Sequence, residues 1–257
     1  MAGEVLRVGH TVRRRAGPWT PAVHELLRHL EQVDFQGAPR ALGMDRHDRE
    51  ILSFIPGDVV HPRMLDDADL ARVARLIRDY HAAVASFMPS AVAHWQTDGR
   101  DPSVADELVC HNDLAPRNLI VGEQSWASID WDLVAPGRCL WDLAPPVCNF
   151  VPLWPEQPAG IRRYRVSCEA YGLARADERE LLKRCARAYE THVAHVGRQC
   201  GPRAVRGSGT RGPRRQLAAR SRACRATDPA LEQPAALTAL SDGKLRAAHN
   251  LSWARAG

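Results

Sequence analysis

Three oxygen-bearing side chains lie around two short apolar segments in the middle of the chain. The stretch VCHNDLAPRNLIV at 109–121 contains Asp113 and Asn118, and ASIDWD at 127–132 contains Asp130. A carboxylate can orient a hydroxyl group or accept its proton, whereas an amide and a second carboxylate are the hard oxygen ligands that Mg²⁺ prefers. This combination is suited to phosphoryl transfer from ATP, which depends mainly on positioning and on neutralising charge.

A pair of short strands would bring these side chains together. Leu119–Val121 and Ala127–Ile129 are apolar and flank the sequence GEQSW, which is typical of a hairpin turn. Because the strands of a hairpin lie side by side, we expect Asn118 and Asp130 at the same mouth of the hairpin. In the alternative interpretation, Asp113 and Asn118 only cap a turn.

The remaining pattern predicts an α+β fold with two lobes. Strands are expected at Val5–Val8 and Thr11–Arg14, a helix near Thr20, a hairpin between Ala41 and Ile55, and helices at 70–84, 161–172 and 177–189. Residues 1–57 would form a small lobe of one sheet and one helix. Residues 58–196 would form a mainly helical lobe that carries the hairpin described above.

The charge is unevenly distributed along the chain. Residues 196–257 contain twelve of the 35 Lys and Arg but three of the 30 Asp and Glu, so they carry +9 and residues 1–195 carry −4. A basic segment can indicate nucleic-acid binding. This one has Trp253 as its single aromatic residue and little periodicity, so we expect no nucleic-acid partner.

Residues 197–257 also differ from the rest of the chain in composition. They are rich in Arg, Ala, Gly and Pro and have no continuous apolar face, which predicts a disordered tail. Codons for these residues are rich in G and C. We therefore hypothesise that this segment is read out of frame in a GC-rich gene, which resequencing of the locus would test.

The cysteines and the apolar segments indicate a cytoplasmic protein. None of the seven cysteines forms a CxxC pair, so reduced thiols are expected and a zinc site is not. The chain has no apolar run near the roughly 18 residues that a membrane span needs. Its N-terminus also lacks the apolar core of a signal peptide. No membrane partner is expected.

The sequence HNDLAPRN followed by IDWD resembles the aminoglycoside phosphotransferase and choline kinase-like family, which has a protein-kinase-like fold. SFIPG at 53–57 and LWDLA at 140–144 extend the similarity, which covers about residues 5–195. The resemblance implies transfer of the γ-phosphate of ATP, with Mg²⁺, to a hydroxyl of a small molecule. Substrates of this family are often cationic, such as aminoglycosides and amino alcohols.

The resemblance also assigns roles to individual residues. It implies that Asp113 is the catalytic aspartate, that His111 is a structural member of the catalytic loop, and that Asp142 braces this loop. Asn118 and Asp130 would bind Mg²⁺. The backbone of Ser53, Phe54 and Ile55 would face the adenine ring.

The cation that holds the phosphates must be an arginine. Family members usually place a Lys or Arg on the third strand, but this chain has only Lys183 and Lys244, both far downstream. Strand alternation puts Val12 and Arg14 on one face, which favours Arg14 over Arg13. Guanidinium groups bind phosphate well. Glu25 on the following helix is a candidate partner for this cation.

An alternative function follows from the short N-terminal lobe. Only a few residues precede Val5, so we expect the first strand and the glycine-rich loop of the family to be missing or shortened. The alternative is therefore an inactive or nucleotide-binding-only pseudokinase. Binding of nucleotide without phosphate transfer would favour it.

Overall fold

The computed structural model describes residues 5–61, 64–96, 101, 107–123, 125–151 and 159–185. The predicted tail at 197–257 lies outside these residues. Described residues up to Phe150, with Val166–Leu173, form one compact unit, and residues 151, 159–165 and 174–185 belong to a second. The division into residues 1–57 and 58–196 stays a prediction. Within the described ranges, every helix is too short or too polar to cross a bilayer.

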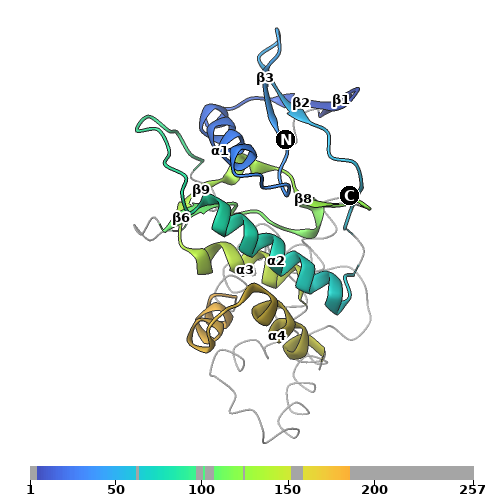
Figure 1. Ribbon diagram of the computed structural model, residues 1–257, viewed down its shortest axis with the longest axis vertical. Coiled ribbons are helices and arrows are strands. Elements are labelled where there is room, and N and C mark those ends of the chain that lie inside the picture. The colour runs from blue at the N-terminus through green and yellow to red at the C-terminus, as the bar shows by residue number, and fades with distance from the viewer. Residues whose placement is uncertain are drawn as a thin grey trace, which may run out of the picture. The chain divides into compact units, whose positions relative to one another are not determined.

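Four antiparallel strands and one helix form the N-terminal part of the first unit, as the sequence predicts (Figure 1). The strands lie in the order β1 (Leu6–Val8), β2 (Thr11–Arg15), β4 (Arg49–Ser53) and β3 (Ala41–Met44). Helix α1 (Thr20–Gln32) connects β2 to β3 and has Pro21 in its first turn, where a missing N–H costs nothing. In the register of β2 and β4, Arg14 lies opposite Glu50.

A hydrophobic core cluster joins this sheet to the helical elements that follow it. Helix α2 (Asp67–Val84) begins after Asp66, whose carboxylate accepts a hydrogen bond from the amide of Asp69. Leu27 of α1 is fully buried and belongs to the same core cluster as Leu52 of β4 and Tyr80 of α2. The core is thus continuous between the sheet and α2.

Short strands and helices complete the first unit. They are β5 (Asp58–Val59), β6 (Leu108–Cys110), η1 (Pro116–Asn118), β7 (Leu119–Val121), β8 (Trp126–Ser128), η2 (Trp131–Leu133), β9 (Ala135–Gly137) and α3 (Cys139–Phe150). Strands β5, β7 and β8 form one sheet, and β6 pairs with β9. The predicted hairpin is confirmed, although its second strand begins one residue earlier than expected, at Trp126. Helices α2 and α3 contact each other below the N-terminal sheet (Figure 1).

Two further helical segments follow α3. The helix predicted near 161–172 is confirmed as α4 (Ala159–Tyr171), and residues 175–185 are also helical. Gly172 ends α4 with φ of 87°, and the amide of Leu173 donates back to the carbonyl of Cys168. This left-handed conformation is the reason a glycine terminates the helix.

Shortening Leu27 should measurably destabilise the fold. Leu27→Ala removes a fully buried side chain from the core, and we expect it to lower the free energy of unfolding by about 2–5 kcal/mol. Val92→Ala is the control, because Val92 is 88% exposed. Urea denaturation followed by tryptophan fluorescence would measure both. Equal stability of the two variants would contradict a shared core.

Candidate active site

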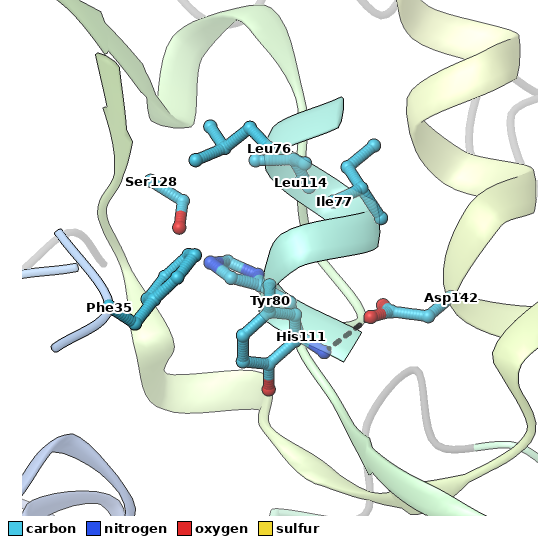
Figure 2. Close-up of a pocket in the computed structure, with 8 residues that line it drawn as sticks. All are labelled: Phe35, Leu76, Ile77, Tyr80, His111, Leu114, Ser128 and Asp142. Atoms are coloured by element: carbon cyan, nitrogen blue, oxygen red, sulfur yellow. Dashed lines mark hydrogen bonds between the residues drawn. The ribbon is translucent and has the colours of Figure 1, made fainter. Parts of the chain in front are cut away.

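The loop formed by residues 111–118 connects β6 to β7 and is fixed at its start by Asp142 of α3. Asp142 is 2% exposed. Its Oδ2 accepts the amide of His111 at 2.9 Å (Figure 2). Its Oδ1 accepts the amide of Asn112 at 2.7 Å. Asn112 has a left-handed backbone, with φ of 64°, and its side chain donates to the carbonyl of Leu133. The loop therefore begins in one defined conformation.

His81 of α2 compensates the buried charge of Asp142. Its Nε2 lies 3.0 Å from Asp142 Oδ2. Burial alone would lower the pKa of His81, but the hydrogen bond and charge of Asp142, with Cys139, raise it to about 9. Burial would likewise raise the pKa of Asp142, but its hydrogen bond to His81 and the charge there lower it. At neutral pH the two groups form an imidazolium–carboxylate pair.

His111 supports the loop from inside the protein. Its side chain is 2% exposed, and its ring centroid lies 4.6 Å from that of Trp131. Burial lowers the pKa of His111, so the imidazole is neutral at neutral pH. The ring lines a small cavity together with Phe35, Leu114 and other mainly apolar side chains (Figure 2). The volume of this cavity, about 10 Å³, is at the lower limit for one water molecule, so it is not a substrate pocket.

Asp113 lies on the partly exposed side of the loop and is held by two neighbours. The η1 turn brings Asn118 back toward it, so that Asn118 Nδ2 donates to Asp113 Oδ2 at 2.9 Å and to its carbonyl at 2.8 Å. Arg117 donates to Asp113 Oδ1. Sequence reasoning missed Arg117, although it stands four positions after Asp113. Because Asn118 Nδ2 makes both of these contacts, Oδ1 is the side-chain atom of Asn118 that could bind a cation.

Asp130 is positioned by the hairpin. The amide of Ile129 donates to the carbonyl of Asn118 at 2.9 Å, which places Asp130 beside Asn118 as expected. Asp130 has φ of 63°, and its carboxylate is 47% exposed. Strands β7 and β8 therefore bring the two predicted Mg²⁺ ligands to one mouth of the hairpin.

Arg14 of β2 binds three carboxylates at once. Its Nε lies 2.5 Å from Glu50 Oε1, while the two terminal nitrogens lie 2.9 Å from Asp130 Oδ1 and 2.6 Å from Asp132 Oδ1. Burial would lower the pKa of Arg14, but these carboxylates raise it. Arg13 lies next to it in the strand and instead reaches Asp45 at 3.4 Å. Of the two arginines, Arg14 is the one that contacts Asp130 and Asp132.

Glu25 was a candidate partner of Arg14, but the carboxylates that Arg14 contacts are Glu50, Asp130 and Asp132. Glu25 Oε2 accepts the amide of Ser90 at 3.4 Å, whereas Glu50 lies opposite Arg14 in the β2–β4 register. Residues opposite each other on paired strands have neighbouring side chains on one face. His24, the residue before Glu25, reaches Glu50 from α1, with 3.1 Å between its Nε2 and Glu50 Oε2.

Comparison with known proteins identifies the family. The sequence profile of the Phosphotransferase enzyme family matches residues 1–181, more than half of the chain. The chain belongs to this phosphotransferase family. It is also 35% identical over 144 residues to the trifolitoxin immunity protein of Rhizobium leguminosarum bv. trifolii, covering 54% of this chain and 55% of that protein. The chain thus spans about half the length of this curated relative.

Three solved structures are similar to this chain. A choline/ethanolamine kinase family protein from Mesorhizobium loti has a TM-score of 0.49 at 15% identity, covering 95% of this chain and 90% of that one. An ethanolamine kinase from Plasmodium vivax has a TM-score of 0.45 at 11% identity, covering 71% of each chain. The aminoglycoside phosphotransferase APH(3'')-Id from Streptomyces rimosus has a TM-score of 0.41 at 14% identity, covering 70% of this chain and 90% of that one.

Two backbone amides of the segment expected to face adenine already donate hydrogen bonds within the protein. The amide of Ser53 donates to the carbonyl of Arg40, and that of Phe54 to the carbonyl of His10, each at 2.9 Å. Adenine binding at this segment would therefore use carbonyl groups or the amide of Ile55. The ring of Phe54 is covered by the guanidinium of Arg7, at 3.6 Å from its centroid.

Asn118 and Asp130 fit a Mg²⁺ ion that also binds ligands from outside the protein. Arg14 and its three carboxylates together carry a charge of −2. Among the residues described by the structure, no group of three or more His, Cys, Asp or Glu could hold a metal ion. Asn118 and Asp130 would supply one amide and one carboxylate oxygen. Protein sites for Mg²⁺ commonly offer one or two carboxylates and leave other positions to phosphates and water.

Removing Arg14 should destabilise the protein, because Glu50 is 1% exposed and would lose its guanidinium partner, keeping the contact with the imidazole of His24. Breaking a buried pair in this way costs about 3–5 kcal/mol, and we expect a loss of this order for Arg14→Leu in chemical denaturation. Adding Glu50→Gln to that variant should recover part of the loss. Arg13→Leu is the matched control, and an equal effect there would refute the special role of Arg14.

The His81–Asp142 pair should make stability depend on pH. The pKa of His81 is about 9 in the folded state, above its ordinary value of 6.5. Its contribution is therefore complete below about pH 6.5 and is lost as the pH rises through about 9. We expect the difference in free energy of unfolding between the unmodified protein and His81→Gln to shrink across this window. A constant difference, measured by urea titration at both ends of the window, would contradict this assignment.

Proposed function

We propose that this phosphotransferase is an ATP- and Mg²⁺-dependent kinase that transfers the γ-phosphate to a hydroxyl of a small molecule. The observation that carries the proposal is the double contact of Asn118. Its side chain donates to Asp113, while its backbone carbonyl accepts the amide of Ile129 beside Asp130. A partly exposed carboxylate is thereby held next to two candidate metal ligands, which is the arrangement that phosphoryl transfer needs.

Asp113 is suited to orient the acceptor hydroxyl and to take its proton. Each oxygen of a carboxylate has two lone pairs, so the contacts of Oδ1 with Arg117 and Oδ2 with Asn118 leave sites for a further hydrogen bond. In the proposed step, the acceptor oxygen forms a bond to the γ-phosphorus as the bond from that phosphorus to the β-phosphate oxygen breaks. The hydroxyl proton passes to Asp113, and ADP leaves.

Mg²⁺ would supply charge neutralisation on the phosphates at Asn118 and Asp130. Arg14 is the cation that would bind the phosphates, because its guanidinium lies 2.9 Å from Asp130 and is 14% exposed. In the present conformation Asp130 and Asp132 hold two of its nitrogens. Nucleotide binding would exchange these carboxylates for phosphate oxygens, which present similar bidentate geometry.

This occupation of Asp130 by Arg14 favours one alternative function, a protein that binds nucleotide without transferring phosphate. A guanidinium that stays on Asp130 would compete with Mg²⁺ for the same carboxylate. The two functions differ in a direct experiment that measures ATP binding by calorimetry and phosphate transfer in the same preparation. Tight binding with no transfer to any acceptor would favour the alternative.

For the acceptor, we propose an amino alcohol or an aminoglycoside-like molecule. The excess negative charge of the Arg14 cluster, and of residues 1–195 as a whole, favours cationic molecules near the site. One relative is named as a trifolitoxin immunity protein, so the acceptor panel should also contain trifolitoxin. Phosphorylation of any of these compounds would be detected as a mass increase of one phosphoryl group.

Asp113→Asn should separate chemistry from binding. The substitution keeps the size of the side chain but removes the proton acceptor, so we expect turnover to fall about a hundred- to ten-thousand-fold. ATP affinity should change little, because Asp113 is not assigned to the nucleotide. Asp48→Asn is the matched control at an exposed turn position with φ of 55°, a conformation that Asn tolerates. Near-normal turnover of Asp113→Asn would refute the proposed mechanism.

A further inference from the structure

The two ends of the Arg14 guanidinium lie in different surroundings. Its Nε lies 2.5 Å from Oε1 of Glu50, whose side chain is 1% exposed, and both of these atoms are shielded from solvent. Its terminal nitrogens contact Asp130 and Asp132, whose side chains are 47% and 32% exposed. The contact with Glu50 is therefore closed to water, whereas the contacts with the two aspartates are open to water and to ligands.

Glu50 is itself held by a histidine of helix α1. Nε2 of His24 lies 3.1 Å from Glu50 Oε2, and both side chains are buried. An ionised carboxylate only accepts hydrogen bonds, so His24 Nε2 carries a proton and donates the bond. Glu50 thus has one oxygen on the guanidinium of Arg14 and the other on the imidazole of His24, and it is fixed from two elements of the fold.

The position of His24 is set by the hydrophobic core. Val23 and Leu27 of the same helix belong to the core cluster, and Leu27 lies three positions after His24, so the two side chains are neighbours on the helix surface. The adjacent Glu25 instead accepts the amide of Ser90. Helix α1 therefore contributes an imidazole to the pair formed by Arg14 and a carboxylate, and the carboxylate itself comes from β4.

We propose that Glu50 and His24 are positioning residues that anchor Nε of Arg14 while its two terminal nitrogens exchange Asp130 and Asp132 for phosphate oxygens of the nucleotide. This inference rests on the proposed function. Shielded ion pairs are screened by water and salt much less than exposed ones, so the exposed contacts are the ones that a phosphate can replace. With one end fixed, the guanidinium can release Asp130 and still face the phosphates.

The first test measures the affinities of His24 variants for ATP and for adenosine by calorimetry. Adenosine has no phosphates, so only ATP reports on the guanidinium. His24→Leu removes the donor to Glu50, and the preference for ATP over adenosine should fall about tenfold, as for loss of a hydrogen bond to a charged group. His24→Gln should restore most of the preference, because its amide can donate from nearly the position of Nε2. An unchanged preference in folded His24→Leu would overturn the proposal.

His29→Leu is the matched control for this test. His29 lies on the same helix, and its Nε2 lies 2.9 Å from the carbonyl oxygen of Ala83. The substitution therefore removes a hydrogen bond of the same kind at a different place in the fold. It should lower the free energy of unfolding but keep the preference for ATP over adenosine. An equal fall in this preference for His29→Leu and His24→Leu would show that His24 has only a structural role.

The second test needs no nucleotide and measures the anchor directly. By NMR of isotope-labelled protein, the Nε–H of Arg14 should exchange slowly with water, because Nε is shielded from solvent; its signal is assigned by its absence in Arg14→Lys. His24→Leu and Glu50→Gln should accelerate this exchange, whereas Asp132→Asn, which changes an exposed contact, should leave it unchanged.

The two tests distinguish failure of the anchor from failure of the proposed function. Equal exchange of the Arg14 Nε–H in His24→Leu and in the unmodified protein would refute the anchor, whatever the protein binds. Absence of ATP binding by the unmodified protein, with slow exchange at Nε, would overturn the proposed function and with it the role of the anchor in nucleotide binding.

Discussion

The buried carboxylate of Asp142 is the interaction on which the site depends. A charge removed from water must be compensated by donors at close range, and Asp142 obtains them from the amides of His111 and Asn112 and from the imidazole of His81. These donors come from the loop and from α2, whereas the carboxylate comes from α3. The position of the start of the loop is therefore set by the packing of two helices.

A partly buried ion of opposite sign, Arg14, fixes the other side of the site. Arg14 connects β2 to Glu50 of β4 and to Asp130 and Asp132. Between the two ions, Asp113 and Asn118 are joined by local contacts within six residues of sequence. Asp113 and Asn118 are thus held to each other by a contact that is local in sequence. The ionic contacts of Asp142 and Arg14, on either side of them, join residues that are far apart in sequence.

The sequence predicted the local contacts and missed most of the distant ones. The hairpin and the proximity of Asn118 to Asp130 follow from apolar strands and a short turn, and strand alternation separated Arg14 from Arg13. Glu50 was not recognised as the partner of Arg14, because a strand register across intervening elements cannot be read from propensity or spacing. The i,i+4 spacing of Asp113 and Arg117 was a usable signal for that pair.

The run of three arginines in β2 has a consequence for the tolerance of the fold to sequence change. A shift of one residue between paired strands moves every side chain to the opposite face. In most strands such a slip would replace an essential group by one of different chemistry. Here the residues on either side of Arg14 are Arg13 and Arg15, so either slip would again place a guanidinium opposite Glu50. A one-residue change in the register of β2 against β4 would therefore still leave an arginine opposite Glu50.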